Sequence, residues 1–159
     1  MKHPTTVDFL RISEENKRLW DFPNCIGSLD GKHVRIKCSS HSGSMFFNYK
    51  HYFSIVLQGL VDDHYIFISI DVGGYEKQSD GGTFQASKLS KLSEKNKLGI
   101  PEEKIPHSNH NLPHVFIADE VYPLKENLMK PYFAQMLNRS QENFIYLFIY
   151  LFVLYTTEK

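Results

Sequence analysis

Residues 52–72 read YFSIVLQGLVDDHYIFISIDV and decide the fold class. Two runs in this stretch, 52–61 and 65–72, are rich in β-branched and aromatic residues, which favour strands. The polar segment Asp62-Asp63-His64 between them is typical of a turn. The stretch therefore predicts two buried strands that pair as an antiparallel hairpin.

The chain before the hairpin predicts one helix and one strand. Residues 7–20 place apolar side chains between charged ones, as in an amphipathic helix. Pro23 predicts its end, because the residue before a proline is pushed out of the helical region. Val34 and Ile36 alternate with basic residues, which predicts a strand over 25–36. Residues 39–45 are polar and predict a loop.

The chain after the hairpin predicts a helix, a long loop and a short strand. Ser79 or Asp80 can cap a helix whose apolar stripe includes Phe84 and Leu89. Residues 94–113 are polar with three prolines, and we expect a loop there. Residues 114–119 predict a buried strand that ends in an acid, and irregular structure with a short helix near 128–129 follows. The whole pattern predicts a mixed α/β domain.

The composition excludes several classes of protein. The 159 residues carry 18 basic and 18 acidic side chains, with 42% apolar and 14% aromatic residues. This length fits one domain with a sizeable core. The balanced charge excludes a strongly basic domain that binds nucleic acid through charge alone. Two cysteines, Cys25 and Cys38, are too few for a disulfide framework, and no signal peptide is recognisable, so we expect a reduced, intracellular protein.

The last sixteen residues differ from the rest. Residues 144–155 read FIYLFIYLFVLY, without a charge. We therefore divide the chain into a domain over 1–143 and a divergent hydrophobic tail over 144–159. Twelve residues fall short of the 17–25 that span a bilayer, so we expect no membrane anchor. Three explanations of the tail remain. It is a core element, an exposed surface prone to association, or a sequence translated past a splice site or frameshift.

Three acids are candidate metal ligands because of their positions. Asp30 lies in a strand, Asp80 begins a helix, and Asp119 ends a buried strand. Gly31 and Gly81 leave room for a ligand to approach the backbone. Carboxylates that converge from separate elements suit Mg²⁺ or Mn²⁺. Each acid alone also fits an ordinary turn, helix cap or loop start.

Other candidates are weaker. His107, His110 and His114 lie in a loop rich in proline and asparagine and lack cysteine partners at zinc-site spacing, so we predict no zinc site there. Of Asp119 and Glu120, only one is expected to face a site, because neighbouring strand residues point to opposite sides. Asp71 is a weaker candidate, since a strand acid before Gly73-Gly74 also fits a solvent-facing position.

Five blocks of sequence resemble the DDE endonuclease domain of PIF/Harbinger transposases and the nucleases derived from them. They are WDFPNCIGSLDGKHV at 20–34, SMFFNYK at 44–50, the hairpin over 60–73, SDGGTF at 79–84 and ADEVYPL at 118–124. The blocks stand in the family's order and extend over about residues 4–143.

The resemblance implies a fold, a site and a reaction. The fold is RNase H-like, a mixed sheet with an antiparallel meander flanked by helices. The site is a divalent-metal DDE centre that acts on DNA phosphodiesters, in which Asp30 is the first acid and Asp80 and Asp119 are further metal ligands. The sequence leaves open which of Asp80 and Asp119 is the second acid of the triad, and the strand order favours Asp119. Family knowledge also implies a separate DNA-binding partner protein and a nuclear location, with the cytoplasm as a second one.

The chain departs from the family after residue 143. The family's Arg-rich helix and its final catalytic Glu are not recognisable, and Leu154, Tyr155 and Thr156 occupy the expected position of that Glu. We therefore expect a catalytically incomplete nuclease domain, or, as the alternative, a domesticated non-catalytic interaction module. Lys32 and His33 are candidates to approach the metal or phosphate. Three basic residues are candidates for DNA backbone contacts, although a solvated surface fits them as well: Arg35, Lys37 and Lys50.

Overall fold

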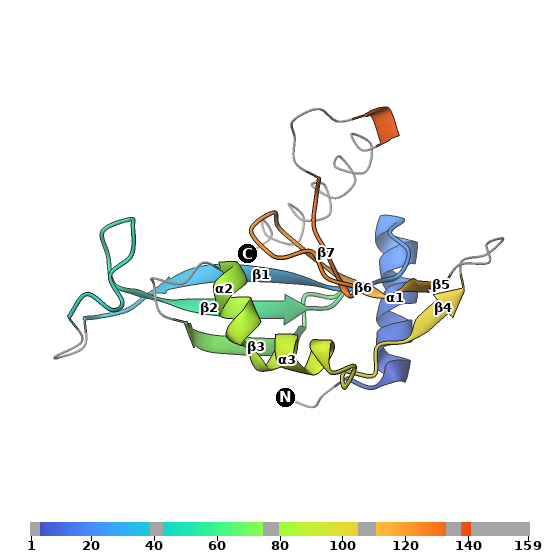
Figure 1. Ribbon diagram of the computed structural model, residues 1–159, viewed down its shortest axis with the longest axis horizontal. Coiled ribbons are helices and arrows are strands. Elements are labelled where there is room, and N and C mark those ends of the chain that lie inside the picture. Colours follow the sequence, from blue (N-terminus) through green and yellow to red (C-terminus); the bar gives the residue numbers. More distant parts are fainter. Residues whose placement is uncertain (1–3, 39–42, 75–79, 105–110, 133–137, 141–159) are drawn as a thin grey trace.

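A computed structural model describes residues 4–38, 43–74, 80–104, 111–132 and 138–140. It confirms the predicted mixed α/β class, with a five-stranded mixed sheet flanked by helices (Figure 1). The elements in chain order are α1 (Thr6–Trp20), β1 (Cys25–Arg35), β2 (Ser54–Val61), β3 (Phe67–Gly74), α2 (Asp80–Ala86), α3 (Lys88–Glu94), β4 (Glu102–Lys104), β5 (Asn111–Pro113), β6 (Val115–Ala118) and β7 (Leu128–Met129).

The main sheet has the strand order β3-β2-β1-β6-β7. β2 pairs antiparallel with both β1 and β3, which confirms the predicted hairpin. β6 pairs parallel with β1 and with β7. β1 is therefore the strand at which the antiparallel meander meets the parallel part of the sheet.

Helix α1 has well-formed ends. Thr5 and Asp8 form a reciprocal capping box at its start, in which each side chain accepts from the other residue's backbone amide. Asp21, in the left-handed conformation at φ 52°, ends the helix. The buried amide of Asn16 donates to the carbonyl of Cys25 at 3.0 Å, which ties α1 to the first residue of β1.

The larger hydrophobic core of the described residues lies on one side of the sheet, and a smaller cluster of Phe22, Cys25 and Ile117 packs separately. Phe9 from α1 and Phe84 from α2 pack in the larger core with Leu29 and Phe116, and the Phe9 and Phe116 rings meet edge to face with centroids 6.1 Å apart. Figure 1 shows α2 and α3 lying over the β1–β3 meander and α1 crossing the end of the sheet. The other buried members of this core are Ile26, Leu60, Ala118, Tyr122 and Leu128.

A bulge in β1 sets the register of its pairing with β6. The β1–β6 pairing shifts between Cys25 and Ser28, and Gly27 stands between them at φ 145°. A Cβ on Gly27 would lie 2.6 Å from the carbonyl oxygen of Val61. Only glycine fits this conformation and this close approach without a backbone shift.

Two predictions of secondary structure were wrong and one was incomplete. Part of the predicted loop over 94–113 forms the small antiparallel sheet β4–β5. Residues 128–129 form β7 rather than a helix, because the edge of β6 offers them backbone hydrogen bonds. The predicted helix after Ser79 is two helices, since Ser87 is extended and caps α3 by accepting from the Ser90 amide.

Two further expectations concern the membrane and the tail. Among the described residues, no helix combines the length and apolar composition needed to cross a bilayer. The hydrophobic tail at 144–159 lies outside the described residues.

The two cysteines are expected to react at very different rates. Cys25 is buried, and burial raises the pKa of its thiol to about 12, whereas Cys38 is exposed. Because the thiolate is the nucleophile, we expect a chromogenic disulfide reagent to titrate one thiol in the folded chain and two in guanidinium chloride. Cys38→Ser is the control, and it should leave no rapidly reacting thiol. Two fast thiols in the folded wild-type chain would contradict the burial of Cys25.

Candidate active site

Asp30 lies within β1, on the side of the sheet away from the larger core. Leu29 points into the core, and successive strand residues alternate in direction. The half-buried carboxylate of Asp30 accepts a hydrogen bond from the Gly31 amide at 2.8 Å through Oδ1. This bond fixes the carboxylate against its own strand.

Asp119 lies beside Asp30. Leu29 and Ala118 are register partners in the parallel β1–β6 pair, and each of the two acids directly follows one of these partners. Neighbouring strands lie about 4.8 Å apart. The structure thus brings Asp30 and Asp119 to adjacent positions, as the strand order in the sequence analysis favoured.

A turn holds Asp119 in place. Its Oδ1 accepts from the Val121 amide at 3.0 Å, and its carbonyl accepts from the Tyr122 amide at 3.3 Å. Tyr122 is fully buried; its hydroxyl accepts from the Gln58 side chain at 3.0 Å, and its ring meets that of Phe84 edge to face. Tyr122 therefore anchors the turn to β2 and α2. The sequence analysis missed this role, although a tyrosine in a polar turn between apolar elements was a visible signal.

Asp80 is the first residue of α2, and its backbone lies near the same turn. A Cβ on Gly81 would come within 2.7 Å of the carbonyl oxygen of Val121. The helix start can therefore approach the turn after Asp119 only because residue 81 is glycine. The position of the Asp80 side chain lies outside what the structure describes.

The other sequence candidates on the sheet lie on both of its sides. By alternation Lys32 faces the same side as Asp30, and it is exposed. His33 faces the opposite side, where its Nδ1 lies 3.4 Å from the Ser54 hydroxyl and its ring meets that of Tyr49. Asp71 is exposed on β3, opposite Gln58.

The structure describes some of the remaining acid and histidine candidates. Glu120 is exposed in the turn after Asp119. His114 is fully buried, and its Nδ1 donates to the Pro101 carbonyl at 2.8 Å, so it is a packed core residue. His107 and His110 lie outside the described residues.

A second group of chemically active side chains was missed by the sequence analysis. Glu15, Asp63 and His64 each offer one potential ligand atom, and these atoms lie within 4.8 Å of one another. The segment Asp62-Asp63-His64 had been assigned only to a turn, because nothing in the sequence places Glu15 beside it. An adjacent acid and histidine in that turn were the only signal.

Comparison with known families agrees with the geometry. A family model described as DDE superfamily endonuclease matches residues 29–147, a range that includes Asp30, Asp80 and Asp119. The chain belongs to this DDE endonuclease family. Searches of curated proteins and of solved structures each found no match. Membership indicates a transposase-like nuclease function with DNA as the substrate, and DDE endonucleases generally use divalent metals.

Proposed function

We propose that this DDE domain is a divalent-metal nuclease domain of the Harbinger type, with an RNase H-like fold and Asp30, Asp119 and Asp80 as metal ligands. The single observation that carries the proposal is the parallel register Leu29↔Ala118, which sets Asp30 and Asp119 side by side. The approach of Gly81 to Val121 supports Asp80 as the third acid. The strand order, with an antiparallel meander beside a parallel pair, supports the fold.

The donor set fits Mg²⁺ or Mn²⁺. Carboxylate oxygens from neighbouring elements are the ligands that these ions prefer. When bound, such ions lower the pKa of a coordinated water or hydroxyl and stabilise the charge on a leaving phosphodiester oxygen. The chain itself holds the carboxylates in place, through the Gly31 amide on Asp30 and the Val121 amide on Asp119.

Lys32 is proposed to contact a DNA phosphate beside the site. It is exposed on the same side of β1 as Asp30, two residues further along. Three basic residues that we propose to contact the DNA backbone are exposed too: Arg35, Lys37 and Lys50. The guanidinium of Arg35 lies 4.5 Å from the ring centroid of Tyr52. Because the formal net charge is zero, we propose that tight DNA binding depends on a separate DNA-binding partner in the nucleus.

The 159-residue chain is proposed to lack cleavage activity. Glu158 is the only acid in residues 144–159, and its sequence context differs from that of the family's final catalytic Glu. We expect the purified chain to nick supercoiled plasmid no faster than its Asp30→Ala variant, with either Mg²⁺ or Mn²⁺. Robust nicking that disappears in Asp30→Ala would overturn this part of the proposal and establish a complete nuclease.

The alternative is a non-catalytic interaction module, and one observation favours it. The side of the meander that carries Asp30 leaves apolar side chains exposed: Val34 at 38%, Ile70 at 40% and Val72 at 52%. Such a face suits a protein contact. An interaction module needs no bound metal, so specific Mn²⁺ binding at Asp30 distinguishes the two functions.

A further inference from the structure

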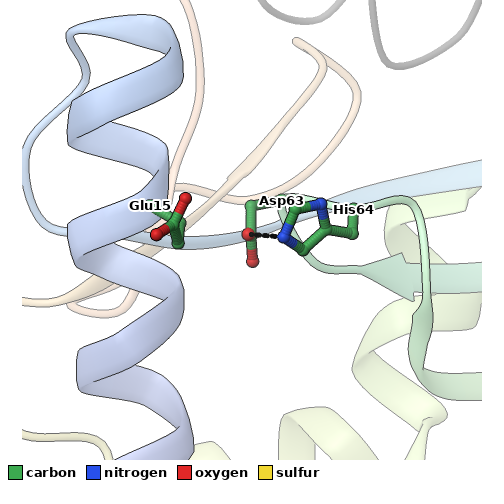
Figure 2. Close-up of side chains that lie close together, drawn as sticks. All are labelled: Glu15, Asp63 and His64. Carbon is green, nitrogen blue, oxygen red and sulfur yellow. Dashed lines mark ion pairs between the residues drawn. The ribbon is translucent and has the colours of Figure 1, made fainter.

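Glu15, Asp63 and His64 form a compact group away from the Asp30 site. Figure 2 shows Glu15 on α1 facing Asp63 and His64, which lie in the turn between β2 and β3. Val61 pairs with Ser28, whereas Gly59 pairs with Asp30. The turn after Val61 therefore lies toward the amino end of β1, and Asp119 follows the carboxyl end of the neighbouring β6.

Asp63 is buried without the hydrogen bonds that a buried carboxylate needs. Its side chain is fully buried, and neither oxygen accepts a hydrogen bond from any residue that the structure describes. Burying a carboxylate is costly, and a cation beside it stabilises its ionised form.

The turn itself does not explain Asp63. Asp62 already holds the turn, because its Oδ1 accepts from the amides of His64 and Ile66, both at 2.9 Å. Among the described residues, two basic side chains lie close to Asp63: the ring of His64, at 3.2 Å between Nε2 and Oδ2, and Arg11, at 3.9 Å between Nη1 and Oδ1. Arg11 is half-exposed, and its long side chain can turn toward solvent.

The spacing of one pair within the group, Asp63 and His64, fits a metal ion. Two ligands about 2.1 Å from a tetrahedral metal lie about 3.4 Å apart, close to the 3.2 Å between Asp63 Oδ2 and His64 Nε2. Arg18 donates two hydrogen bonds to the Glu15 carboxylate, at 3.0 Å from Nε and 2.6 Å from Nη2. Both of these bonds end on Oε2, which leaves Oε1 to face a cation.

We propose that Glu15, Asp63 and His64 bind one divalent transition-metal ion of the Zn²⁺ type. One imidazole nitrogen with two carboxylate oxygens favours Zn²⁺ over Mg²⁺ and Ca²⁺, which prefer oxygen ligands alone. The ion neutralises the buried Asp63 and links α1 to the β2–β3 turn. The site is independent of the DDE acids, and its role is to stabilise the fold.

The test measures Zn²⁺ binding by the full chain carrying Asp30→Asn and Asp119→Asn, so that the DDE site contributes no binding. We expect one Zn²⁺ per chain in competition with a chromophoric chelator, and Co²⁺ as a second probe should give visible absorption bands. Glu15→Gln and His64→Gln should each weaken this binding at least about tenfold. The matched controls Glu14→Gln and His51→Gln, at exposed residues outside the group, should bind as the parent does.

Two outcomes would overturn the proposal. One is a parent chain that binds no Zn²⁺ at 100-fold excess. The other is a Glu15→Gln and a His64→Gln variant that bind Zn²⁺ as tightly as their controls. Thermal melting without metal checks that each variant folds, and added Zn²⁺ should raise the Tm of the parent but not that of His64→Gln.

Discussion

Replacing Asp30 with asparagine is expected to weaken Mn²⁺ binding by at least about tenfold. Asparagine keeps the shape of the side chain, and its carbonyl can still accept from the Gly31 amide, so the fold should be unaffected. It removes one of the two charges that the Leu29↔Ala118 register sets side by side. Loss of a residue that merely supports a metal ligand costs about 10–100-fold in affinity, and a ligand should cost no less. Calorimetric Mn²⁺ titration measures the effect.

The design separates this site from the one at Glu15. All chains in the comparison carry Glu15→Gln, which disables the second group. Asp119→Asn should match Asp30→Asn, because Val121 can still donate to the asparagine. Asp71→Asn, at an exposed acid of β3, should bind Mn²⁺ as the parent does. Equal Mn²⁺ affinity in the Asp30 and Asp71 variants would refute the assignment of Asp30.

Replacing Phe116 with alanine is expected to destabilise the domain by about 3–5 kcal/mol. The ring is buried on β6 against Phe9, so its removal leaves a cavity that the surrounding strands cannot close. For a domain of this size each kcal/mol shifts Tm by about 2–4 °C, which gives a fall of about 6–20 °C. Thermal unfolding followed by circular dichroism measures it.

Leu124→Ala is the control for this prediction. Leu124 is 70% exposed, and exposed substitutions usually change stability by about 0.5 kcal/mol or less. A Tm for Phe116→Ala within 2 °C of that for Leu124→Ala would show that the core does not depend on the Phe116 ring.

Local patterns account for the elements that were predicted well. The apolar runs at 52–61 and 65–72 became β2 and β3, because each is long enough to bury one side of a strand. The capping box at Thr5 and Asp8 was not predicted. β4 and β7 were not predicted either, since two or three residues carry no periodicity. Pairing with a neighbouring strand makes them strands.

The sequence by itself determined that Asp30 lies in a strand and that Asp119 ends one, because hydrophobic alternation is a local property. Only the tertiary structure decided that the two acids are neighbours. Their approach depends on a register between strands about 90 residues apart, set by the bulge at Gly27 and by packing around Leu29 and Ala118. Glu15 meets Asp63 for the same reason, since a helix and a turn distant in the chain come together only when both bury their apolar sides against one sheet.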